Sequence, residues 1–320
     1  MNVLVTGTAG FIGFHLAKRL LAEGHRVTGL DNFNDYYAVT LKEDRHRQLA
    51  ACPGYRGVRG DLCDLELLHR LFREEQFEVV VNLAAQAGVR YSLTHPFAYL
   101  KANLEGHLSV LEACRHGGKP RLVYASSSSV YGGNTKLPFS ETDRVDHPVS
   151  LYAVTKKSDE LMSHAYSHLY GMQTVGLRFF TVYGPWGRPD MAMWSFTERI
   201  LQGQPIPVFN HGEMRRDFTY VDDIVSGIMG AMTAPGLGSC EIFNLGNNQS
   251  EKLLDMIAVL EAALGCQAKL ELLPMQPGDV PVTYADVEKA RSQLGFAPVT
   301  PIAAGIPRFV AWYKEYHGVA

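Results

Sequence analysis

The amino-acid sequence predicts an α/β fold, in which a doubly wound parallel sheet is followed by a smaller C-terminal lobe. Two observations in the first half predict the sheet. Short β-branched runs alternate with helical patterns, and a glycine-rich turn joins the first run to the first helix. A third observation predicts the lobe, because prolines divide the second half of the 320-residue chain into shorter elements.

Strands and helices are expected to alternate up to residue 177. Buried strands are predicted at residues 3–5, 26–30, 55–59, 79–82, 121–125 and 174–177, and helices at residues 11–23, 65–74, 97–115 and 151–170. We place a domain boundary near residue 180, so that residues 1–180 form the first domain and residues 181–320 mainly the second. Residues 217–240 contain a further strand and helix pattern and are expected to return to the first domain.

Composition and charge exclude two kinds of partner. A net charge of −3 and a pI near 6.5 provide no basic surface for nucleic acid. The longest apolar runs, such as residues 78–85, are far shorter than the roughly 20 residues that span a bilayer. We therefore expect neither a nucleic-acid nor a membrane partner.

The N-terminus and the cysteines predict a cytoplasmic protein. Met1 is followed directly by the first strand, without the apolar stretch of a signal peptide. The cysteines are odd in number and form no Cys-x-x-Cys pair, which is typical of reduced thiols with packing roles. They are Cys52, Cys63, Cys114, Cys240 and Cys266.

The glycine-rich turn after the first strand is predicted to bind a dinucleotide. Gly7, Gly10 and Gly13 form a pattern that follows a strand at once and opens a helix. Gly7 permits a tight turn, Gly10 lets the backbone approach a pyrophosphate, and Gly13 lets helix and strand pack closely. The pyrophosphate would bind at the positive helix N-terminus, beside Phe11 and Ile12. The alternative is a glycine-rich turn that binds no ligand.

Asp31 favours NAD over NADP as the dinucleotide. It ends the second predicted strand, where a carboxylate would hydrogen-bond the adenosine ribose and repel a 2′-phosphate. Asn32 follows it and is expected at the same site. Asp61 and Leu62, after the third strand, could contact adenine, and a helix N-cap is nearly as good an interpretation of Asp61.

A tyrosine and a lysine are candidates for the chemistry. Tyr152 and Lys156 lie four residues apart, on one face of a predicted helix. A free phenol has a pKa of about 10, so a phenol that acts as a base near neutral pH needs nearby cations to stabilise its phenolate. The strand at residues 121–125 runs into Ser127 and Ser128, and serines at the carboxyl end of a parallel strand face the cofactor crevice. Each motif alone could also be an ordinary surface pair or a serine-rich turn.

Together these motifs resemble the extended short-chain dehydrogenase/reductase family, and within it the nucleotide-sugar 4-epimerases. The resemblance covers essentially the whole chain. It rests on Gly7-x-x-Gly10-x-x-Gly13, Asn82-Leu83-Ala84-Ala85, Ser127 with Val130-Tyr131-Gly132, Tyr152-x-x-x-Lys156, Arg216-Asp217-Phe218 and Pro277-Gly278-Asp279.

The resemblance implies a Rossmann-type fold, with NAD bound by residues 1–180 and a UDP-sugar bound mainly by residues 181–320. Tyr152 would be the catalytic base, Lys156 would hold the nicotinamide ribose, and Ser127 would hydrogen-bond the sugar 4-hydroxyl. Further cofactor contacts are expected from Leu83, Ala84, Ala85 and Asn103, and further substrate contacts from Ser128, Arg216 and Asp279.

Departures from related patterns favour 4-epimerisation over elimination or decarboxylation. The 4,6-dehydratases carry Thr-Asp-Glu where this chain has Ser127-Ser128-Ser129, and the xylose-forming decarboxylases carry glutamate at the position of Ser129. Elimination needs that acid and base, and this chain has neither carboxylate there.

Residues 178–192 resemble the corresponding segment of UDP-glucuronate 4-epimerases. Thr181 stands where UDP-galactose epimerases have asparagine, and Arg188 suits a carboxylate because a guanidinium binds it bidentately. We expect Arg188, with Thr181, to hold the C6 carboxylate of a uronic acid. Arg90, after the fourth strand, is a second candidate.

The expected reaction is therefore the 4-epimerisation of UDP-glucuronic acid to UDP-galacturonic acid through a 4-keto intermediate. Three alternatives remain open: a 4-epimerase of another UDP-sugar, a nucleotide-sugar dehydrogenase or decarboxylase of the same fold, and a non-catalytic NAD-binding module. The resemblance also implies a homodimer that pairs the helices at residues 97–115 and 151–170. No metal site is predicted, because His164 and His168 lie opposite an apolar stripe of their helix.

Overall fold

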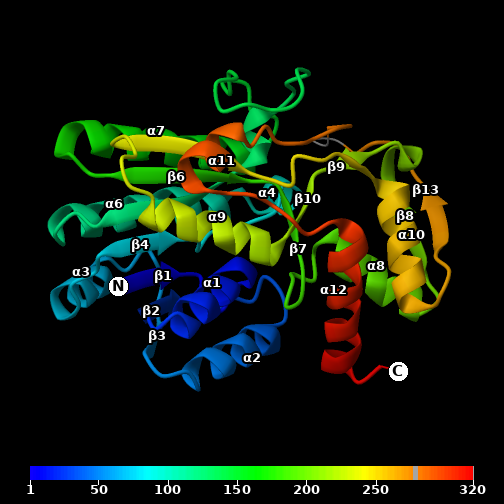
Figure 1. Cartoon of the computed structure of the whole chain (residues 1–320), viewed down its shortest axis with the longest axis horizontal. Helices are drawn as coiled ribbons and strands as arrows, with labels where there is room; N and C mark the ends of the chain where they lie inside the picture. The colour runs from blue at the N-terminus through cyan, green and yellow to red at the C-terminus, as the bar shows by residue number, and fades with distance from the viewer. Residues whose placement is uncertain (277–279, 320) are drawn as a thin grey trace.

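A seven-stranded parallel sheet forms the centre of the computed structural model, which describes residues 1–276 and 280–319 (Figure 1). Its order is β11-β6-β5-β4-β1-β2-β3, and all neighbours pair in parallel. The strands are β1 (Asn2–Thr6), β2 (Arg26–Asp31), β3 (Tyr55–Arg59), β4 (Val79–Asn82), β5 (Arg121–Ser127), β6 (Thr174–Phe179) and β11 (Cys240–Leu245). The predicted fold class is confirmed, and the six predicted strands agree with the observed ones to within two residues.

Two apolar cores cover the opposite faces of this sheet. Successive side chains of a strand point to opposite faces, so Val3 and Val5 of β1 join one core and Leu4 joins the other. The first core includes side chains of α1 (Phe11–Ala22) and α9 (Val221–Thr233), and the second includes side chains of α3 (Leu65–Glu74) and α6 (Gly106–His116). Because both faces are covered, the strands are almost continuously apolar, as the sequence pattern predicted.

The strand order reverses between β1 and β4. From β1 the chain winds outward through β2 and β3, and it then crosses back to β4, β5 and β6 on the other side. Loops that leave the carboxyl ends of β1 and β4 therefore diverge to opposite faces of the sheet. In doubly wound sheets this switch point opens the crevice in which ligands bind.

The predicted helix at residues 97–115 is interrupted. The chain forms α4 (Tyr91–Thr94), α5 (Pro96–Tyr99), a π-helical segment η1 (Leu100–Glu105) and then α6. The prediction of one continuous helix was wrong at residues 100–105, because a π turn inserts an extra residue that apolar periodicity does not signal. Asn103 lies in this segment with its side chain buried.

Helix α7 (Leu151–Tyr170) has the predicted bounds, which are set by the residues that flank its two ends. The Ser150 hydroxyl accepts a hydrogen bond from Ala153 N at 3.2 Å, which caps the N-terminus. Gly171 adopts a left-handed conformation with φ of 66°, which ends the helix. The cap fixes the first turn of α7, where Tyr152 lies.

The smaller lobe stands beside one end of the sheet and has its own apolar core (Figure 1). Trp194, Leu260 and Phe309 of this core come from three different helices. The lobe comprises β7 (Thr181–Tyr183), α8 (Ala192–Leu201), β8 (Pro205–Val208), η3 (Phe209–Gly212), β9 (Arg215–Arg216), β10 (Phe218–Tyr220), β12 (Glu251–Lys252), α10 (Leu253–Leu264), β13 (Lys269–Leu272) and α12 (Ile302–His317).

Part of the second half of the chain lies against the central sheet, which is built mainly by the first half. Helix α9 packs on α1, β11 pairs with β6, and α11 (Glu288–Leu294) contacts both α9 and β11. We propose that the domain boundary stays near residue 180, and that the returning segment, expected at residues 217–240, extends through β11 to Leu245. In the described residues no helix is both long and apolar enough to cross a membrane.

Candidate active site

A cavity of about 400 Å³ opens at the switch point of the sheet. It lies between the loops that leave the carboxyl ends of the strands and the first loop of the smaller lobe. The predicted site residues that line it are Gly7, Gly10, Phe11, Ile12, Gly13, Asp31, Asn32, Asp61, Leu62, Leu83, Ala84, Ala85, Ser127, Ser128, Tyr152, Lys156, Thr181 and Arg188. The structure thus brings 18 of the 22 together.

The glycine-rich turn has the geometry of a phosphate cradle. Gly7 has φ of 75°, and a Cβ atom there would lie 2.9 Å from the backbone nitrogen of Ala84. A Cβ on Gly13 would lie only 2.1 Å from the carbonyl oxygen of Gly7. A side chain at either position would collide with backbone atoms, so glycine lets β1, α1 and the loop after β4 pack this closely at the cavity wall, which is the geometry of a dinucleotide-binding turn.

Asp31 holds this turn from the end of β2. Its carboxylate accepts hydrogen bonds from Ala9 N at 3.0 Å and from Phe33 N at 2.9 Å. A carboxylate has about four lone-pair sites, so these two bonds leave capacity for the hydroxyls of a ribose. Asp31 is buried at the cavity wall, where its carboxylate can hydrogen-bond the ribose hydroxyls.

Asp61 lies on the same side of the cavity, after β3. Its carboxylate accepts hydrogen bonds from Asn32 Nδ2 at 3.0 Å and from Cys63 N at 2.9 Å. Burial alone would raise the pKa of Asp61, but these hydrogen bonds lower it below its ordinary value. The carboxylate is therefore ionised near neutral pH, next to the position expected for adenine. The helix cap proposed as its alternative is instead Asp64, which accepts from Leu67 N at 2.9 Å.

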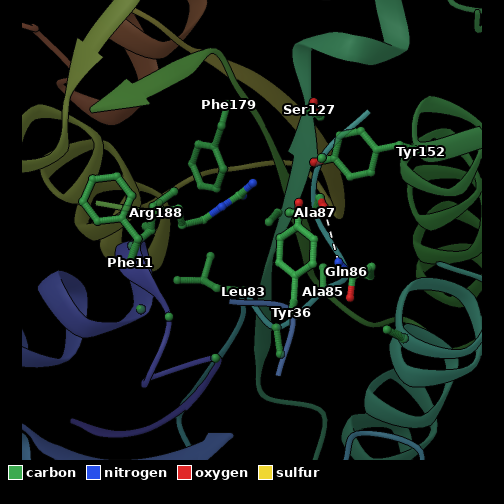
Figure 2. A pocket seen from close by; sticks show the side chains of 18 of the residues that line it. Phe11, Tyr36, Leu83, Ala85, Gln86, Ala87, Ser127, Tyr152, Phe179 and Arg188 are labelled. Atoms are coloured by element: carbon green, nitrogen blue, oxygen red, sulfur yellow. Dashed lines mark hydrogen bonds between the residues drawn. The ribbon is translucent and has the colours of Figure 1, made fainter. Parts of the chain in front are cut away.

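Ser127 ends β5 and faces the cavity. Its hydroxyl accepts a hydrogen bond from Ser129 N at 3.1 Å and caps the short helix η2 (Ser128–Tyr131). It also donates to Ser129 Oγ at 3.1 Å. Figure 2 shows Ser127 and the Tyr152 ring on the same side of the pocket. The strand end and the first turn of α7 thus bring the two hydroxyls to one wall.

Lys156 lies one turn after Tyr152 and is almost fully buried. Its ammonium donates to the carbonyl oxygen of Ala125 at 2.9 Å and to the Asp159 carboxylate at 3.2 Å. The Tyr152 ring packs edge-on against Tyr99, with ring centroids 6.0 Å apart. Two elements therefore orient the Tyr152–Lys156 pair: β5 through Ala125, and the helix before η1 through Tyr99.

Arg188 enters the cavity from the loop between β7 and α8. Figure 2 shows its guanidinium pointing into the pocket from the side opposite Tyr152. Its Nε donates to Asp190 Oδ1 at 3.0 Å, and Nη2 pairs with the other oxygen at 2.5 Å. Tyr36 OH also donates to Asp190 at 3.1 Å. Burial would lower the pKa of Arg188, but the Asp190 carboxylate raises it above its ordinary value, so the guanidinium is charged.

Three of the predicted residues that the structure describes, Asn103, Arg90 and Arg216, are not among those that line the cavity. Asn103 is buried behind the wall, where it accepts from Gln86 N at 2.8 Å and donates to Gln86 O at 3.1 Å. The Arg90 guanidinium lies 5.0 Å from the ring centre of Phe209, and Arg216 donates to the carbonyl oxygen of Pro281 at 3.2 Å. Asp279, with the rest of the Pro277-Gly278-Asp279 motif, lies outside the described residues.

Several lining residues were missed from the sequence. The loop after β2 contributes Tyr36 and Tyr37, the helix that follows it, α2 (Val39–Ala50), contributes Lys42, and the loop after β4 contributes residues 86–89. Both loops continue directly from predicted site residues at the carboxyl ends of strands that flank the switch point. The topology could therefore have identified them, although no local motif marks them.

A parallel sheet with a glycine cradle at its switch point, and a Tyr-x-x-x-Lys helix beside a strand-end serine, defines a dinucleotide-dependent enzyme of the short-chain dehydrogenase/reductase class. The sequence pattern of the NAD dependent epimerase/dehydratase family matches residues 3–246. The chain belongs to this family, which confirms both the predicted resemblance and NAD as the predicted cofactor.

Relatives with similar sequences and structures extend over the whole chain. Protein CapI of Staphylococcus aureus is 50% identical, over 99% of this chain and 99% of its own length. UDP-glucuronate 4-epimerase 2 of Arabidopsis thaliana is 46% identical, over 99% of this chain and 76% of its own length. The crystal structure of the UDP-glucuronic acid 4-epimerase of Bacillus cereus, in complex with UDP-glucuronic acid and NAD, has a TM-score of 0.92 and 34% identity, and the match covers 99% of this chain and 100% of that one.

Proposed function

We propose that this chain catalyses the NAD-dependent 4-epimerisation of UDP-glucuronic acid to UDP-galacturonic acid. The observation that carries the proposal is the position of Arg188, whose guanidinium faces Tyr152 across one cavity. Tyr152 on one side could act as the base at C4 of the sugar. The guanidinium of Arg188 on the other side has the planar geometry that binds a carboxylate, as a sugar with a charged C6 requires. The UDP-glucuronate 4-epimerases among its relatives support the same substrate.

The residues around the first half of the cavity would hold the cofactor. Gly7, Gly10 and Gly13 would receive the pyrophosphate at the N-terminus of α1, and Asp31 would bind the adenosine ribose. Lys156 would bind the nicotinamide ribose. When bound there, NAD would supply the hydride chemistry at C4 of the sugar, as the acceptor in the oxidation and the donor in the reduction to the epimer.

The remaining expected cofactor contacts fall into two groups. Those that line the cavity, and for which direct contact is proposed, are Phe11, Ile12, Asn32, Asp61, Leu62, Leu83, Ala84 and Ala85. Asn103 holds both backbone groups of Gln86. We therefore propose that Asn103 acts indirectly, by fixing the loop after β4.

Tyr152 and Ser127 would move the proton of the reacting hydroxyl. The Tyr152 phenolate accepts the proton of the sugar 4-hydroxyl, while Ser127 holds the oxygen in place by a hydrogen bond. The Lys156 ammonium stabilises the phenolate. When the ketone is reduced again, Tyr152 returns the same proton, so one turnover exchanges no net proton with solvent.

Arg188 addresses a hazard specific to a uronic acid. Oxidation at C4 produces a β-keto acid, which loses carbon dioxide fastest when the bond to the carboxylate stands perpendicular to the ketone plane. Arg188, with Thr181 on the adjoining strand, would hold the carboxylate away from that geometry. In the described residues Nη1 of Arg188 makes no hydrogen bond, whereas Nε and Nη2 face Asp190.

The nucleotide end of the substrate would bind closer to the smaller lobe. Arg216 is proposed to contact the diphosphate, because a charged donor suits phosphate oxygens. Asp279, which lies outside the described residues, is proposed as a further substrate-binding residue. Ser128 is proposed to contact the sugar. Arg90 remains the second candidate for the residue that binds the C6 carboxylate of the substrate.

A homodimer is proposed as the working form. Apolar side chains of the helices between β4 and β6 are strongly exposed: Phe97 is 80%, Leu93 62% and Leu161 58% accessible. Large exposed apolar side chains gathered on neighbouring helices favour association. We propose that a second copy of the chain covers them. The cytoplasm is proposed as its location, because all five cysteines are free.

Product analysis with catalytic NAD+ tests the proposed function. The purified protein is incubated with UDP-glucuronate, the sugar nucleotides are separated, and NADH absorbance is followed, with Tyr152→Phe as the inactive control. UDP-galacturonate without accumulating NADH is expected. Steady NADH would identify a dehydrogenase, a pentose product a decarboxylase, and conversion of UDP-galactose alone a neutral-sugar epimerase; each would overturn the proposal.

A further inference from the structure

A buried carboxylate stands directly behind the proposed catalytic lysine. Asp159 lies one turn after Lys156 on α7 and is 1% exposed. Its Oδ2 accepts a hydrogen bond from the Lys156 ammonium at 3.2 Å. In the described part of the chain its other oxygen, Oδ1, has no hydrogen-bond partner. A carboxylate that is both buried and half-satisfied costs stability, so its presence beside Lys156 calls for an explanation.

Asp159 fixes the direction of the ammonium. Lys156 has three N–H donors, of which one bonds to Ala125 O at 2.9 Å and one to Asp159. These acceptors come from different elements, β5 and α7. They leave one donor for the cavity that Lys156 and Tyr152 both line.

Asp159 is also the carboxylate that offsets the charge of Lys156. Glu160, the next residue, is paired with Arg178 through two bonds of 2.8 and 3.0 Å and accepts from Ser126 Oγ at 2.7 Å. Lys157 lies 3.3 Å from the same carboxylate. Glu160 therefore has its own counter-ions.

The groups that face this pair from the neighbouring elements are neutral near pH 7. His107 of α6 is buried, and burial lowers its pKa to about 3. Tyr124 of β5 is also buried, which raises its phenol pKa well above the ordinary value. Burial raises the pKa of Asp159 to about 7, against the opposing effect of Lys156. Asp159 thus gains or loses its charge near neutral pH, while His107 and Tyr124 stay uncharged.

We propose that Asp159 is a positioning residue that orients the Lys156 ammonium and weakens its stabilisation of the Tyr152 phenolate, and so sets the pH range in which the base is available. The inference rests on the proposed function, because it assigns the base to Tyr152. When Asp159 is ionised, it opposes the field of Lys156 at the phenol. When it takes up a proton, the full field of the ammonium acts on Tyr152 and favours the phenolate.

This arrangement predicts a characteristic pH profile. As the pH falls through neutrality, Asp159 takes up a proton and Lys156 stabilises the Tyr152 phenolate more strongly. The phenolate is therefore protonated over a wider pH range than that of an isolated group. In the wild type, the slope of log kcat against pH on the acid side (the acid limb) should therefore be less than one. In Asp159→Asn the limb should return to a slope of one and move by about 0.5–1 unit to lower pH.

The experiment compares the wild type with Asp159→Asn, and uses Asp255→Asn as the matched control. Asp255 is an exposed carboxylate in the first turn of α10, in the smaller lobe, so its replacement should leave the profile unchanged. The Tyr152 phenol is also titrated by ultraviolet absorbance in the NAD-bound protein, with Tyr152→Phe and the double variant Tyr152→Phe, Asp159→Asn as blanks. That readout needs no substrate, so it separates failure of this inference from failure of the proposed epimerase reaction.

A shift of both the kinetic limb and the Tyr152 titration to lower pH in Asp159→Asn is the expected result. An unchanged titration, or one that moves to higher pH, would overturn the inference even if UDP-glucuronate is epimerised normally. Should Asp159→Asn fail to fold, the wild-type curve still decides, because a limb with a slope of one throughout would exclude a titrating neighbour of Lys156.

Discussion

The guanidinium of Arg45 donates a 2.8 Å hydrogen bond to the backbone carbonyl of Ala9, in the middle of the glycine-rich turn. The same group donates to the carbonyl oxygens of Trp186 at 2.6 Å and Gly187 at 3.0 Å. Arg45 is fully buried on α2 (Val39–Ala50). It therefore ties the proposed cofactor cradle to the loop that carries Arg188.

Replacement of Arg45 by Met should loosen both loops together. Buried carbonyl groups lose their donors, at a cost of about 1–3 kcal/mol each. Because three carbonyl oxygens are affected, we expect the free energy of unfolding to fall by about 3 kcal/mol or more. We also expect the KM for the sugar nucleotide to rise. Urea unfolding with and without NAD measures the first effect, and steady-state kinetics the second.

Arg47→Met is the matched control for this prediction. Arg47 lies on the same helix with its side chain 76% exposed and pairs only with Asp44 in the described residues. A surface pair of this kind contributes roughly 0–1 kcal/mol, so stability should hardly change. Equal losses in the two variants would contradict a linking role for Arg45.

Helix α2 also shows where the sequence pattern was insufficient. Its buried residues are Leu41, Lys42, Arg45 and Leu49, a helical spacing in which two of four side chains are charged. Apolar periodicity therefore did not reveal it, and residues 39–50 were not predicted as a helix. The strands of the sheet were predicted closely because their buried side chains are apolar on both faces.

The candidate site was predictable to the extent that it depends on motifs at strand ends. Gly7, Asp31 and Ser127 each follow from the position of a strand, and the topology brings them to one cavity. The partners of Arg188 did not follow. Tyr36 and Asp190 are 154 residues apart and meet only because the smaller lobe folds over the loop after β2.

The stability of the protein should fall on acidification because of His107. Burial and the nearby Lys156 lower its pKa from 6.5 to about 3. Above pH 6.5 the ring is neutral in both states and its contribution is fully present. Below pH 6.5 the unfolded chain binds a proton that the folded protein excludes, so the contribution is lost progressively down to about pH 3.

The expected loss from this one group between pH 7 and pH 5 is about 2 kcal/mol. Urea unfolding at both pH values should show that loss in the wild type and a smaller one, by about that amount, in His107→Gln. His164→Gln, at an exposed position of α7, should behave as the wild type. The contributions of Asp159 and Asp217 have the opposite sign but are common to all three proteins. A parallel pH dependence in His107→Gln would mean that the buried ring titrates normally.

The proposed dimer predicts a position-dependent effect of charge. Phe97→Asp places a carboxylate in the exposed apolar group on α5, where desolvation against a second copy would be costly. The variant should sediment as a monomer at concentrations at which the wild type sediments as a dimer. Val299→Asp changes a side chain of similar exposure, 78%, outside these helices and should stay dimeric. A monomeric wild type would refute the proposal outright.

Removal of the Arg188 side chain should change both the rate and the outcome of the reaction. A hydrogen bond to a charged group contributes roughly 1.5–3 kcal/mol, so turnover of UDP-glucuronate should fall about 10- to 100-fold in Arg188→Ala. The carboxylate of the 4-keto intermediate would then rotate freely, and a pentose by-product should increase as a share of total product. UDP-glucose, which has no carboxylate, should lose far less activity.

Arg144→Ala serves as the matched control, because that side chain is 88% exposed and pairs only with Asp146 in the described residues. Chromatographic separation of the sugar nucleotides gives rate and by-product from one time course. The two substrates discriminate between the possible causes of a loss. If Arg188→Ala lowers activity equally with UDP-glucuronate and UDP-glucose, Arg188 supports the loop through Asp190 and does not bind the carboxylate. A selective loss without pentose would assign Arg188 to binding alone and leave control of the keto acid to Thr181 and the serines after β5.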